Sequence, residues 1–340
     1  MKHINIPIFI PHLGCPNQCI FCNQRYISGN EAFDESNVEA EIIKVLSTIN
    51  SDDTCEIAFF GGSFTGIDRA LMIRLLDIAQ KYVNLGKVSG IRMSTRPDYI
   101  SREIIDILKK YSVSVVELGI QTMNDDILAY LKRGHTVKDT ENAINLLKEA
   151  KIPFIGQMMI GLPKATIEDE LYCANRICEL GAFGSRIYPT LVFKMTELER
   201  LAQNNEYSPL SVENAIIRSA NVLKIFYKYN VPCIRIGLCD SDNLHSNETF
   251  VAGPNSPSIG EMVKSRLFYE LASDVLVDLK DKDIIIECAE GKTSQVIGNK
   301  KENIIKLKKN FGLSSIKVIE NKNLMQYDIR IRKKEEAKCV

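Results

Sequence analysis

The stretch I-N-I-P-I-F-I-P-H-L-G-C-P-N-Q-C-I-F-C, residues Ile4–Cys22, decides the fold that we expect. It opens on a short apolar run, Ile4–Ile10, which has the length and composition of a strand buried on both faces. Directly after this run, Cys15, Cys19 and Cys22 fall within eight residues of one loop. The stretch therefore predicts a buried strand whose carboxyl end carries a cluster of thiols.

The order of a strand followed by a helix recurs along the chain. Apolar runs typical of buried strands alternate with amphipathic stretches typical of helices. Further strands are expected at Glu56–Phe60, Gly90–Ser94, Val115–Ile120, Phe154–Ile160 and Ser185–Tyr188, and helices at Ser36–Ile49, Arg69–Tyr82, Ser101–Tyr111, Thr140–Glu149 and Thr166–Leu180. Such a series implies parallel strands joined by right-handed crossovers, in either a doubly wound sheet or a partial or full barrel. In both architectures, ligands bind beyond the carboxyl ends of the strands.

After this series the pattern loosens. It predicts a long helix at Val212–Tyr229 and a strand at Cys233–Ile236. A separate small unit follows, with the order strand, helix, helix, strand, strand and a turn at Gly298–Lys301 between its helices. The chain is therefore expected to divide into a main domain, an extension that completes the substrate side and a small α+β cap, at residues 1–200, 201–281 and 282–340.

The composition is that of an ordinary folded protein. Hydrophobic residues make up 45% of the 340 residues and charged residues 25%, which excludes disorder, collagen and coiled coil for the whole chain. The apolar stretch near the N-terminus is broken by Pro7 and Pro11 and is too short for a signal peptide or a membrane span. We therefore expect a cytoplasmic protein with reduced cysteines and no membrane partner.

The charge is balanced overall but unevenly distributed. Lys and Arg number 43, as do Asp and Glu, so no global attraction to nucleic acid or membrane is expected. However, the segment from Lys282 to Val340 carries 14 basic and 8 acidic residues, which leaves 29 and 35 for the rest of the chain. The basic tail is therefore expected to have a partner of its own.

The chemistry of the cysteine cluster narrows its function. Thiolates select iron–sulfur clusters or zinc, and a loop lets the backbone wrap around such a centre. Zinc is the weaker interpretation, because no His or Cys follows Cys22 at finger-like spacing. Three cysteines at this spacing, with Phe21 before the last, resemble those of the radical S-adenosylmethionine (SAM) superfamily.

The resemblance implies a fold and two cofactors. Cys15, Cys19 and Cys22 would hold a [4Fe-4S] cluster with one open iron, which chelates SAM. One electron from the cluster, delivered by a donor such as flavodoxin or ferredoxin, then cleaves SAM to methionine and a deoxyadenosyl radical. The implied architecture is α/β, a partial (β/α)6 barrel followed by the extension and the small unit. The remaining cysteines do not match the motif and are expected in the core or on the surface.

Motifs at the ends of the second to fourth strands add contacts to SAM. Gly61-Gly62-Ser63 is similar to the family segment that contacts the SAM amino group. Three further motifs resemble those of the branch that contains elongator proteins and oxygen-independent coproporphyrinogen oxidases. They are S-T-R-P-D, which contains Ser94 and Arg96, V-E-L-G-I-Q-T and K-R-G-H-T. By that resemblance, Gln121 and Arg133 contact SAM, and the arginine pairs with the carboxylate of SAM.

Later motifs match the same branch with two departures. A family segment at the end of the fifth strand is matched by Q-M-M-I-G-L-P, which contains Met159. In this chain Gln157 stands where relatives often carry an Asp that binds the SAM ribose. An amide still hydrogen-bonds a hydroxyl, without the charge. Ser94 likewise stands where many relatives carry Glu. The matched cofactor residues are thus Phe21, Gly61, Gly62, Ser63, Ser94, Arg96, Gln121, Arg133, Gln157 and Met159.

The basic tail contains a motif of its own. V-I-G-N-K-K-E-N-I-I-K-L, Val296–Leu307, looks like the G-x-x-G turn of a KH-type RNA-binding module, whose glycines let the backbone clamp nucleotides. Lys301 replaces the second glycine, and the neighbouring lysines also fit a solvated helix face. A structural cap is expected, with RNA contact as the alternative.

The motifs leave the substrate open. The leading hypothesis is a lyase that cleaves a carbon–nitrogen bond in a small modified nucleobase, similar in layout to queuine lyases, which would release 7-aminomethyl-7-deazaguanine. The second is a tRNA-modifying enzyme that uses the tail to bind RNA. The third is a non-catalytic iron–sulfur or zinc protein.

Candidate substrate residues come from the strand ends and the returning C-terminal segments: Glu117, Tyr188, Arg235 and Asn255. Glu117 is the expected catalytic residue, because a carboxylate inside a barrel needs donors and the amino-pyrimidine edge of a deazaguanine supplies them. The alternative is that Glu117 pairs with an arginine or lysine of the core.

Overall fold

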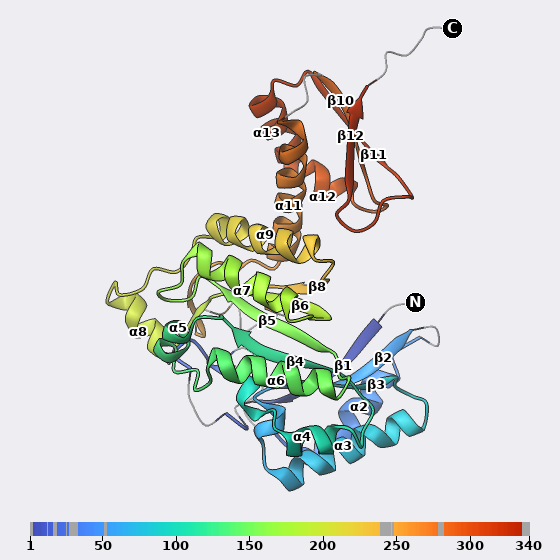
Figure 1. Cartoon of the computed structure of the whole chain (residues 1–340), viewed down its shortest axis with the longest axis vertical. Coiled ribbons are helices and arrows are strands. Elements are labelled where there is room, and N and C mark those ends of the chain that lie inside the picture. The colour runs from blue at the N-terminus through green and yellow to red at the C-terminus, as the bar shows by residue number, and fades with distance from the viewer. Residues whose placement is uncertain are drawn as a thin grey trace.

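Figure 1 shows a large α/β body from which a small unit extends toward the C-terminus. The computed structural model describes residues 3–11, 13–15, 19–24, 26, 33–50, 53–238, 246, 248–277 and 282–334. Cys239 and Cys339, which were expected in the core or on the surface, lie outside these residues. None of the described helices combines the length and apolar character that a membrane span requires.

The large body is built on a curled parallel sheet, which has seven strands within the described residues. Their order is β1-β2-β3-β4-β5-β6-β8. The bounds are β1 (His3–Ile10), β2 (Thr54–Gly61), β3 (Gly90–Thr95), β4 (Val113–Gln121), β5 (Phe154–Ile160), β6 (Gly184–Pro189) and β8 (Cys233–Ile236). Each barrel strand predicted from the sequence lies within an observed one, and the partial barrel is confirmed.

The seventh strand extends the barrel beyond the predicted six. Residues Cys233–Ile236 were expected as a strand, but not as part of this sheet. They pair in parallel with β6, so that Arg186 lies opposite Arg235. The strand is four residues long, and two helices and a short strand separate it from β6, so local periodicity could not place it.

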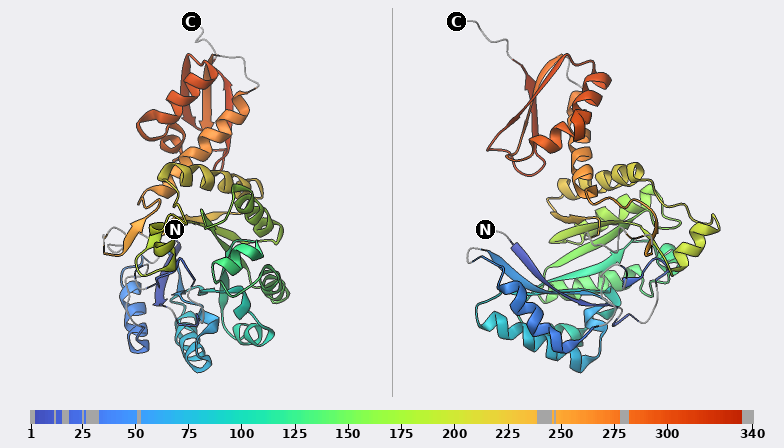
Figure 2. Two further views of the ribbon diagram at one scale, coloured as in Figure 1. Left: turned by 90° about the vertical axis from the view of Figure 1, so that its left-hand side faces the viewer. Right: turned by 180° about the vertical axis from the view of Figure 1, so that it is seen from behind.

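Helices cover the outer face of the sheet (Figure 2). The helices of the large body are α2 (Val38–Leu46), α3 (Arg69–Asn84), α4 (Arg102–Leu108), α5 (Asp125–Tyr130), α6 (Val137–Glu149), α7 (Ile167–Glu179), α8 (Glu197–Gln203) and α9 (Val212–Lys228), with short 3₁₀ turns at Glu35–Asn37, Phe64–Gly66 and Pro97–Tyr99. Of these, α8 lies to the side of the sheet. Capping boxes start α6 at Thr136 and α7 at Thr166, because each threonine exchanges hydrogen bonds with an aspartate three residues on.

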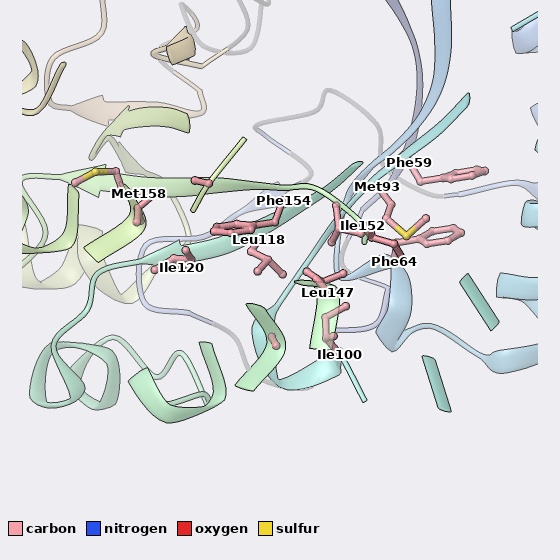
Figure 3. Packing of buried hydrophobic residues seen from close by; sticks show 14 of the residues in the cluster. Phe59, Phe64, Met93, Ile100, Leu118, Ile120, Leu147, Ile152, Phe154 and Met158 are labelled. Atoms are coloured by element: carbon pink, nitrogen blue, oxygen red, sulfur yellow. The ribbon is translucent and has the colours of Figure 1, made fainter. Parts of the chain in front are cut away.

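The core lies between the sheet and these helices. Figure 3 shows Phe59, Leu118 and Phe154 from the strands packed with Leu147 from α6. All four are at most 2% exposed. Burial of such side chains contributes about 1.5–3 kcal/mol each, and it holds the carboxyl ends of the strands in a fixed arrangement.

A short antiparallel pair lies beside the carboxyl ends of the barrel strands. β7 (Val192–Phe193) pairs with β9 (Phe250–Ala252). This pair joins the segment after β6 to the segment that leads into α11 (Ile259–Leu276). The loops around it supply further residues of the site described below.

The small unit has the predicted order. Its elements are β10 (Asp283–Cys288), α12 (Thr293–Ile297), a 3₁₀ turn (Asn299–Lys301), α13 (Glu302–Phe311), β11 (Ser315–Glu320) and β12 (Ile329–Lys333). Within the described residues they form a three-stranded sheet in which β10 runs parallel to β11 and antiparallel to β12.

α11 belongs to both parts of the molecule, because its two halves are buried in different cores. Val263 and Leu267 pack in the core of the barrel. Phe268, Ala272 and Leu276 pack in the core of the small unit. The expected division placed the whole helix in the extension 201–281, whereas the helix also supplies one wall of the small unit.

Candidate functional site

A cavity opens at the carboxyl ends of the barrel strands. It contains about 840 Å³ of empty space, part of it open to solvent. Its lining includes all ten predicted cofactor residues, and the full set is Cys15, Phe21, Cys22, Gln24, Gly61, Gly62, Ser63, Ser94, Thr95, Arg96, Gly119, Gln121, Arg133, Gln157, Met159, Tyr188, Pro189, Leu191, Phe193 and Leu238.

The predicted cluster cysteines lie at one end of this cavity. Cys15 and Cys22 line it, and Cys19 is 6% exposed beside them. Burial, together with the nearby Cys19 and Cys15, raises the pKa of the Cys22 thiol to about 12. The Cys22 side chain can therefore be a thiolate near neutral pH only next to a positively charged centre.

The arrangement of these thiols fits a multi-iron cluster better than a single ion. Among the described residues, no three His, Cys, Asp or Glu side chains converge on the position of one metal ion. A zinc ion needs all of its ligands about 2.0–2.3 Å from one point. In an iron–sulfur cluster, each cysteine binds a different iron, so the sulfurs surround a volume.

Glycines bring the loop after β2 against the cysteine loop. A Cβ at Gly62 would lie 2.0 Å from the Leu13 carbonyl oxygen, and one at Gly61 would lie 2.9 Å from Ile10. The Gly62 and Ser63 amides donate to the Ile10 and Leu13 carbonyls, at 2.8 and 3.2 Å. The pair of glycines therefore anchors the cysteine loop, which is why no side chain fits there.

Two buried arginines contribute donors to the cavity wall. Arg96 is 2% exposed and makes two hydrogen bonds to Asp98, at 2.7 and 2.9 Å. Arg133 is 8% exposed and donates to the Gly119 carbonyl at 2.7 Å, with its other amino group 3.4 Å from the Cys19 sulfur. Within the described residues, Nη1 of Arg96 and Nε of Arg133 have no partner.

These unpartnered donors test whether the cavity fits SAM. A buried N–H without a partner costs about 1–3 kcal/mol, so such donors are expected where a polar ligand completes the site. An amino acid carboxylate supplies acceptors for guanidinium groups. Gly119 makes room for Arg133, because a Cβ there would lie 2.8 Å from its Nη2. The residues present fit both the cluster and SAM.

Gln157 links the cavity to a buried ionic network. Its Nε2 donates to Glu117 at 2.8 Å and to the Ser94 hydroxyl at 3.4 Å. The amide nitrogen is thus held within the protein, and the amide oxygen remains as an acceptor for a ligand hydroxyl. This geometry agrees with the expected contact to a ribose.

Glu117 does not lie where the sequence interpretation placed it. Its side chain is fully buried and does not line the cavity. One carboxylate oxygen accepts from Arg186 at 2.7 Å and from Arg92 at 3.2 Å, and the other accepts from Gln157. Arg92 also pairs with Glu56 at 2.9 Å. The expected contact with a substrate is therefore corrected, and the alternative of a core ion pair is the observed state.

The sequence did contain a signal for this network. Arg92 and Arg186 both lie in the middle of strands that were predicted to be buried, and a buried charge requires a partner. Which strand supplies the partner depends on the register, in which Ser94 lies opposite Glu117 and Gln157 opposite Arg186. The register between neighbouring strands cannot be predicted from the sequence of each strand alone.

The three other predicted substrate residues lie in different parts of the structure. Tyr188 lines the cavity. Asn255 lies in a second, smaller cavity beside it. Arg235 is exposed on the edge strand β8 and lines neither cavity, which corrects its expected place. Sequence reasoning missed seven lining residues of the first cavity, namely Gln24, Thr95, Gly119, Pro189, Leu191, Phe193 and Leu238. Thr95 and Gly119 lie inside the quoted motifs but were not singled out as site residues.

Comparison with known families matches this site. Residues 9–174 match the model of the radical SAM superfamily, and residues 183–269 match the radical SAM C-terminal domain. The chain is a member of the radical SAM superfamily. Its cofactors are therefore a [4Fe-4S] cluster and SAM. When bound, they supply one-electron cleavage of SAM and hence radical chemistry.

Two relatives in the genus Methanocaldococcus place this radical SAM protein near the elongator branch. An uncharacterised protein of M. jannaschii is 30% identical over 228 residues, which cover 64% of this chain and 69% of the relative. The tRNA uridine(34) acetyltransferase of the same organism is 38% identical over 127 residues, which cover 36% of this chain and 24% of the acetyltransferase. The chain thus spans about a quarter of that relative.

A solved structure supports the fold. The Methanocaldococcus infernus Elp3 with an N-terminal deletion superposes with a TM-score of 0.61 at 24% identity, over 80% of this chain and 63% of that one. The similarity establishes a shared radical SAM fold.

Proposed function

We propose that this radical SAM enzyme modifies a nucleoside in RNA and that its small C-terminal unit holds the RNA strand. The observation that carries the proposal is the backbone of the turn Gly298–Lys301. Gly298 has a φ of 78°, and Lys300 and Lys301 have φ values of 48° and 63°. Both lysines thus adopt the left-handed conformation that glycine usually takes. Lys301, at the position of the second glycine of the motif, thus has a backbone conformation that glycine adopts readily.

The charge of this turn favours a phosphate backbone as ligand. Lys300 and Lys301 are exposed, and neither has an ion-pair partner among the described residues. In contrast, Lys306 pairs with Glu302 on the same helix at 3.6 Å. Unpaired lysines attract phosphates by releasing counterions, which gives RNA binding a characteristic dependence on salt.

The helices that flank the turn are fixed to α11. Gln295 of α12 donates to Glu261 at 2.6 Å, and Asn303 of α13 donates to the Ser265 carbonyl at 2.9 Å. Both partners lie in the first half of α11, the half that packs on the barrel. The helices on both sides of the turn are therefore tied to the half of α11 that packs on the barrel.

The name of the acetyltransferase relative indicates tRNA as its substrate, which supports the same assignment. The hypothesis of a lyase acting on a small nucleobase depended on Glu117 as the group that reads the base, and that carboxylate is occupied by Arg92, Arg186 and Gln157. A non-catalytic role is disfavoured because the complete set of cofactor residues surrounds one cavity. A flavodoxin or ferredoxin is the proposed electron donor.

Binding of tRNA tests the proposal. The substrate is total tRNA from a strain that lacks this gene, and the variant is Lys300→Asn combined with Lys301→Asn, because asparagine tolerates the left-handed backbone. We expect weaker binding and a salt slope reduced by about 1 for each lost phosphate contact. Lys309→Gln combined with Lys322→Gln, at two exposed positions outside the turn, is the control for an equal loss of charge. Binding by the double variant with unchanged affinity and salt slope would contradict the proposal.

A further inference from the structure

The sulfur of Cys19 accepts a hydrogen bond from a buried arginine. Nη1 of Arg133 lies 3.4 Å from Cys19 Sγ, and Nη2 of the same side chain donates to the Gly119 carbonyl at 2.7 Å. Arg133 is 8% exposed and Cys19 is 6% exposed, so little solvent competes for either group. The bond to the carbonyl orients the plane of the guanidinium, and this orientation holds Nη1 against the sulfur.

The position of the guanidinium depends on the absence of a side chain at residue 119. A Cβ at Gly119 would lie 2.8 Å from Nη2 of Arg133, which is closer than the Cβ atoms of real proteins approach other atoms. An alanine at this position would therefore push the end of the arginine side chain away and leave its charge in place. This substitution separates the hydrogen bond of Arg133 from its charge.

A second sulfur of the cysteine motif faces a buried hydroxyl. Cys15 Sγ lies 3.7 Å from Oγ of Ser63, which is 1% exposed. Between a thiol and a hydroxyl, either group can donate. A cysteine that binds iron is a thiolate and has no proton, so the hydroxyl is then the donor. Cys15 and Cys19 therefore each have one side-chain donor beside their sulfur.

The third cysteine of the motif is affected by the charge of the arginine. Burial raises the pKa of the Cys22 thiol, and Arg133 acts in the opposite direction, because a nearby positive charge stabilises a thiolate. Arg133 thus acts on the motif through its charge as well as through its hydrogen bond, whereas Ser63 has no charge.

The sulfur ligands of an iron–sulfur cluster become more negative when the cluster is reduced, since reduction adds one electron. Hydrogen bonds to acceptors with more negative charge are stronger. A donor beside a sulfur therefore stabilises the reduced state more than the oxidised state, and hydrogen bonds to the sulfurs are among the factors that set the reduction potential. Burial of the donor increases this effect.

We propose that Arg133 and Ser63 raise the reduction potential of the [4Fe-4S] cluster by donating hydrogen bonds to the sulfurs of Cys19 and Cys15. The inference rests on the family assignment and is independent of the proposed RNA substrate. It gives Arg133 a role before SAM binds, because Nη1 contacts the cysteine whereas Nε has no partner among the described residues and is left for a ligand. The electron itself still comes from the flavodoxin or ferredoxin.

The midpoint potential of the cluster, followed by EPR during stepwise reduction with dithionite, tests the proposal. SAM is omitted, so that effects on its binding do not enter. Arg133→Met removes the hydrogen bond and the charge, Gly119→Ala displaces the guanidinium and keeps the charge, and Ser63→Ala removes the hydroxyl. The control is Lys138→Met, which removes an exposed charge from α6.

We expect a more negative midpoint potential in the three variants and the wild-type potential in the control. Gly119→Ala decides for the donor to Cys19 and Ser63→Ala for the donor to Cys15, also if Arg133→Met assembles no cluster. The wild-type potential in both overturns the proposal, because a shift in Arg133→Met alone then reflects only the charge.

A second measurement detects the contact with Cys19 directly. In protein with nitrogen-15-labelled arginine, pulsed EPR of the reduced cluster should show a weakly coupled labelled nitrogen that is absent from Arg133→Met. If Arg133→Met assembles no cluster, the coupling should be weaker in Gly119→Ala. A wild-type spectrum without this coupling refutes the hydrogen bond from Arg133.

Discussion

Removing the carboxylate of Glu117 is expected to destabilise the barrel and to weaken SAM binding. In Glu117→Ala, Arg92 keeps its ion pair with Glu56. Among the described residues, the side chain of Arg186 keeps only its hydrogen bond of 3.4 Å to the Tyr188 hydroxyl. Loss of one partner from a buried ion pair costs about 3–5 kcal/mol, because the other charge stays buried without compensation. Gln157 also loses the acceptor that orients its amide.

The free energy of unfolding from urea titration measures this cost, and a SAM binding isotherm measures the effect on Gln157. Glu117→Gln keeps the shape of the side chain and should cost less than Glu117→Ala, since hydrogen bonds to charged groups contribute about 1.5–3 kcal/mol. The control is Glu149→Gln, whose side chain is 61% exposed and faces Arg102 at 3.5 Å. That surface pair should contribute at most about 1 kcal/mol.

One result would refute the positioning role. If Glu117→Gln has the stability and SAM affinity of wild type but loses substrate-dependent SAM cleavage, then the carboxylate contacts the substrate. The network of Arg92, Arg186 and Gln157 would then have to rearrange when substrate binds.

Three further predictions concern the cofactor cavity. Cys19→Ala should lose the brown colour, iron and sulfide of the cluster. Cys178→Ala, which removes a buried cysteine that does not line the cofactor cavity, should retain them. A full cluster in Cys19→Ala would contradict the ligand assignment. Arg133→Ala should weaken SAM binding by about 1.5–3 kcal/mol, against no change in Lys132→Ala, which removes a surface pair with Glu197. Burial, aided by Arg133 and Arg96, lowers the pKa of His135 from 6.5 to about 3. Between pH 6.5 and pH 3 the ring therefore takes up a proton on unfolding, and the free energy of unfolding falls by up to about 1.4 kcal/mol for each pH unit that the pH drops. His135→Asn should flatten this part of the stability–pH profile, and an unchanged profile would show that the ring is not held neutral in the folded protein.

The parts of the fold that local sequence determines were predictable. Each barrel strand is a run of apolar residues between turns, and each covering helix has its own period and cap, so Phe154–Ile160 was found with its observed bounds. The cofactor residues were found because a motif fixes position as well as residue type. Gly61 and Gln121 end β2 and β4 and Gln157 lies within β5, yet all three line the same cavity at one end of the barrel.

The remaining features depend on contacts between strands. Whether Glu117 faces a ligand or two arginines is decided by the register of four strands, and β8 joins the sheet only because α9 returns the chain to the edge of β6. The second cavity likewise forms where Pro189, Gly237 and Pro254, distant in sequence, come together. A single sequence read by pattern contains none of these pairings.

The shared helix α11 sets the limits of the piece that could be exchanged between proteins. A fragment that begins at Lys282 lacks Phe268, Ala272 and Leu276, which form one side of its apolar core. A chain that stops at residue 281 exposes the same three side chains to water. Residues 259–334 are not a separable unit either, because Val263 and Leu267 in the first half of this helix pack in the core of the barrel. The small unit therefore cannot be added or removed at either end of α11 without exposing one of the two cores to water.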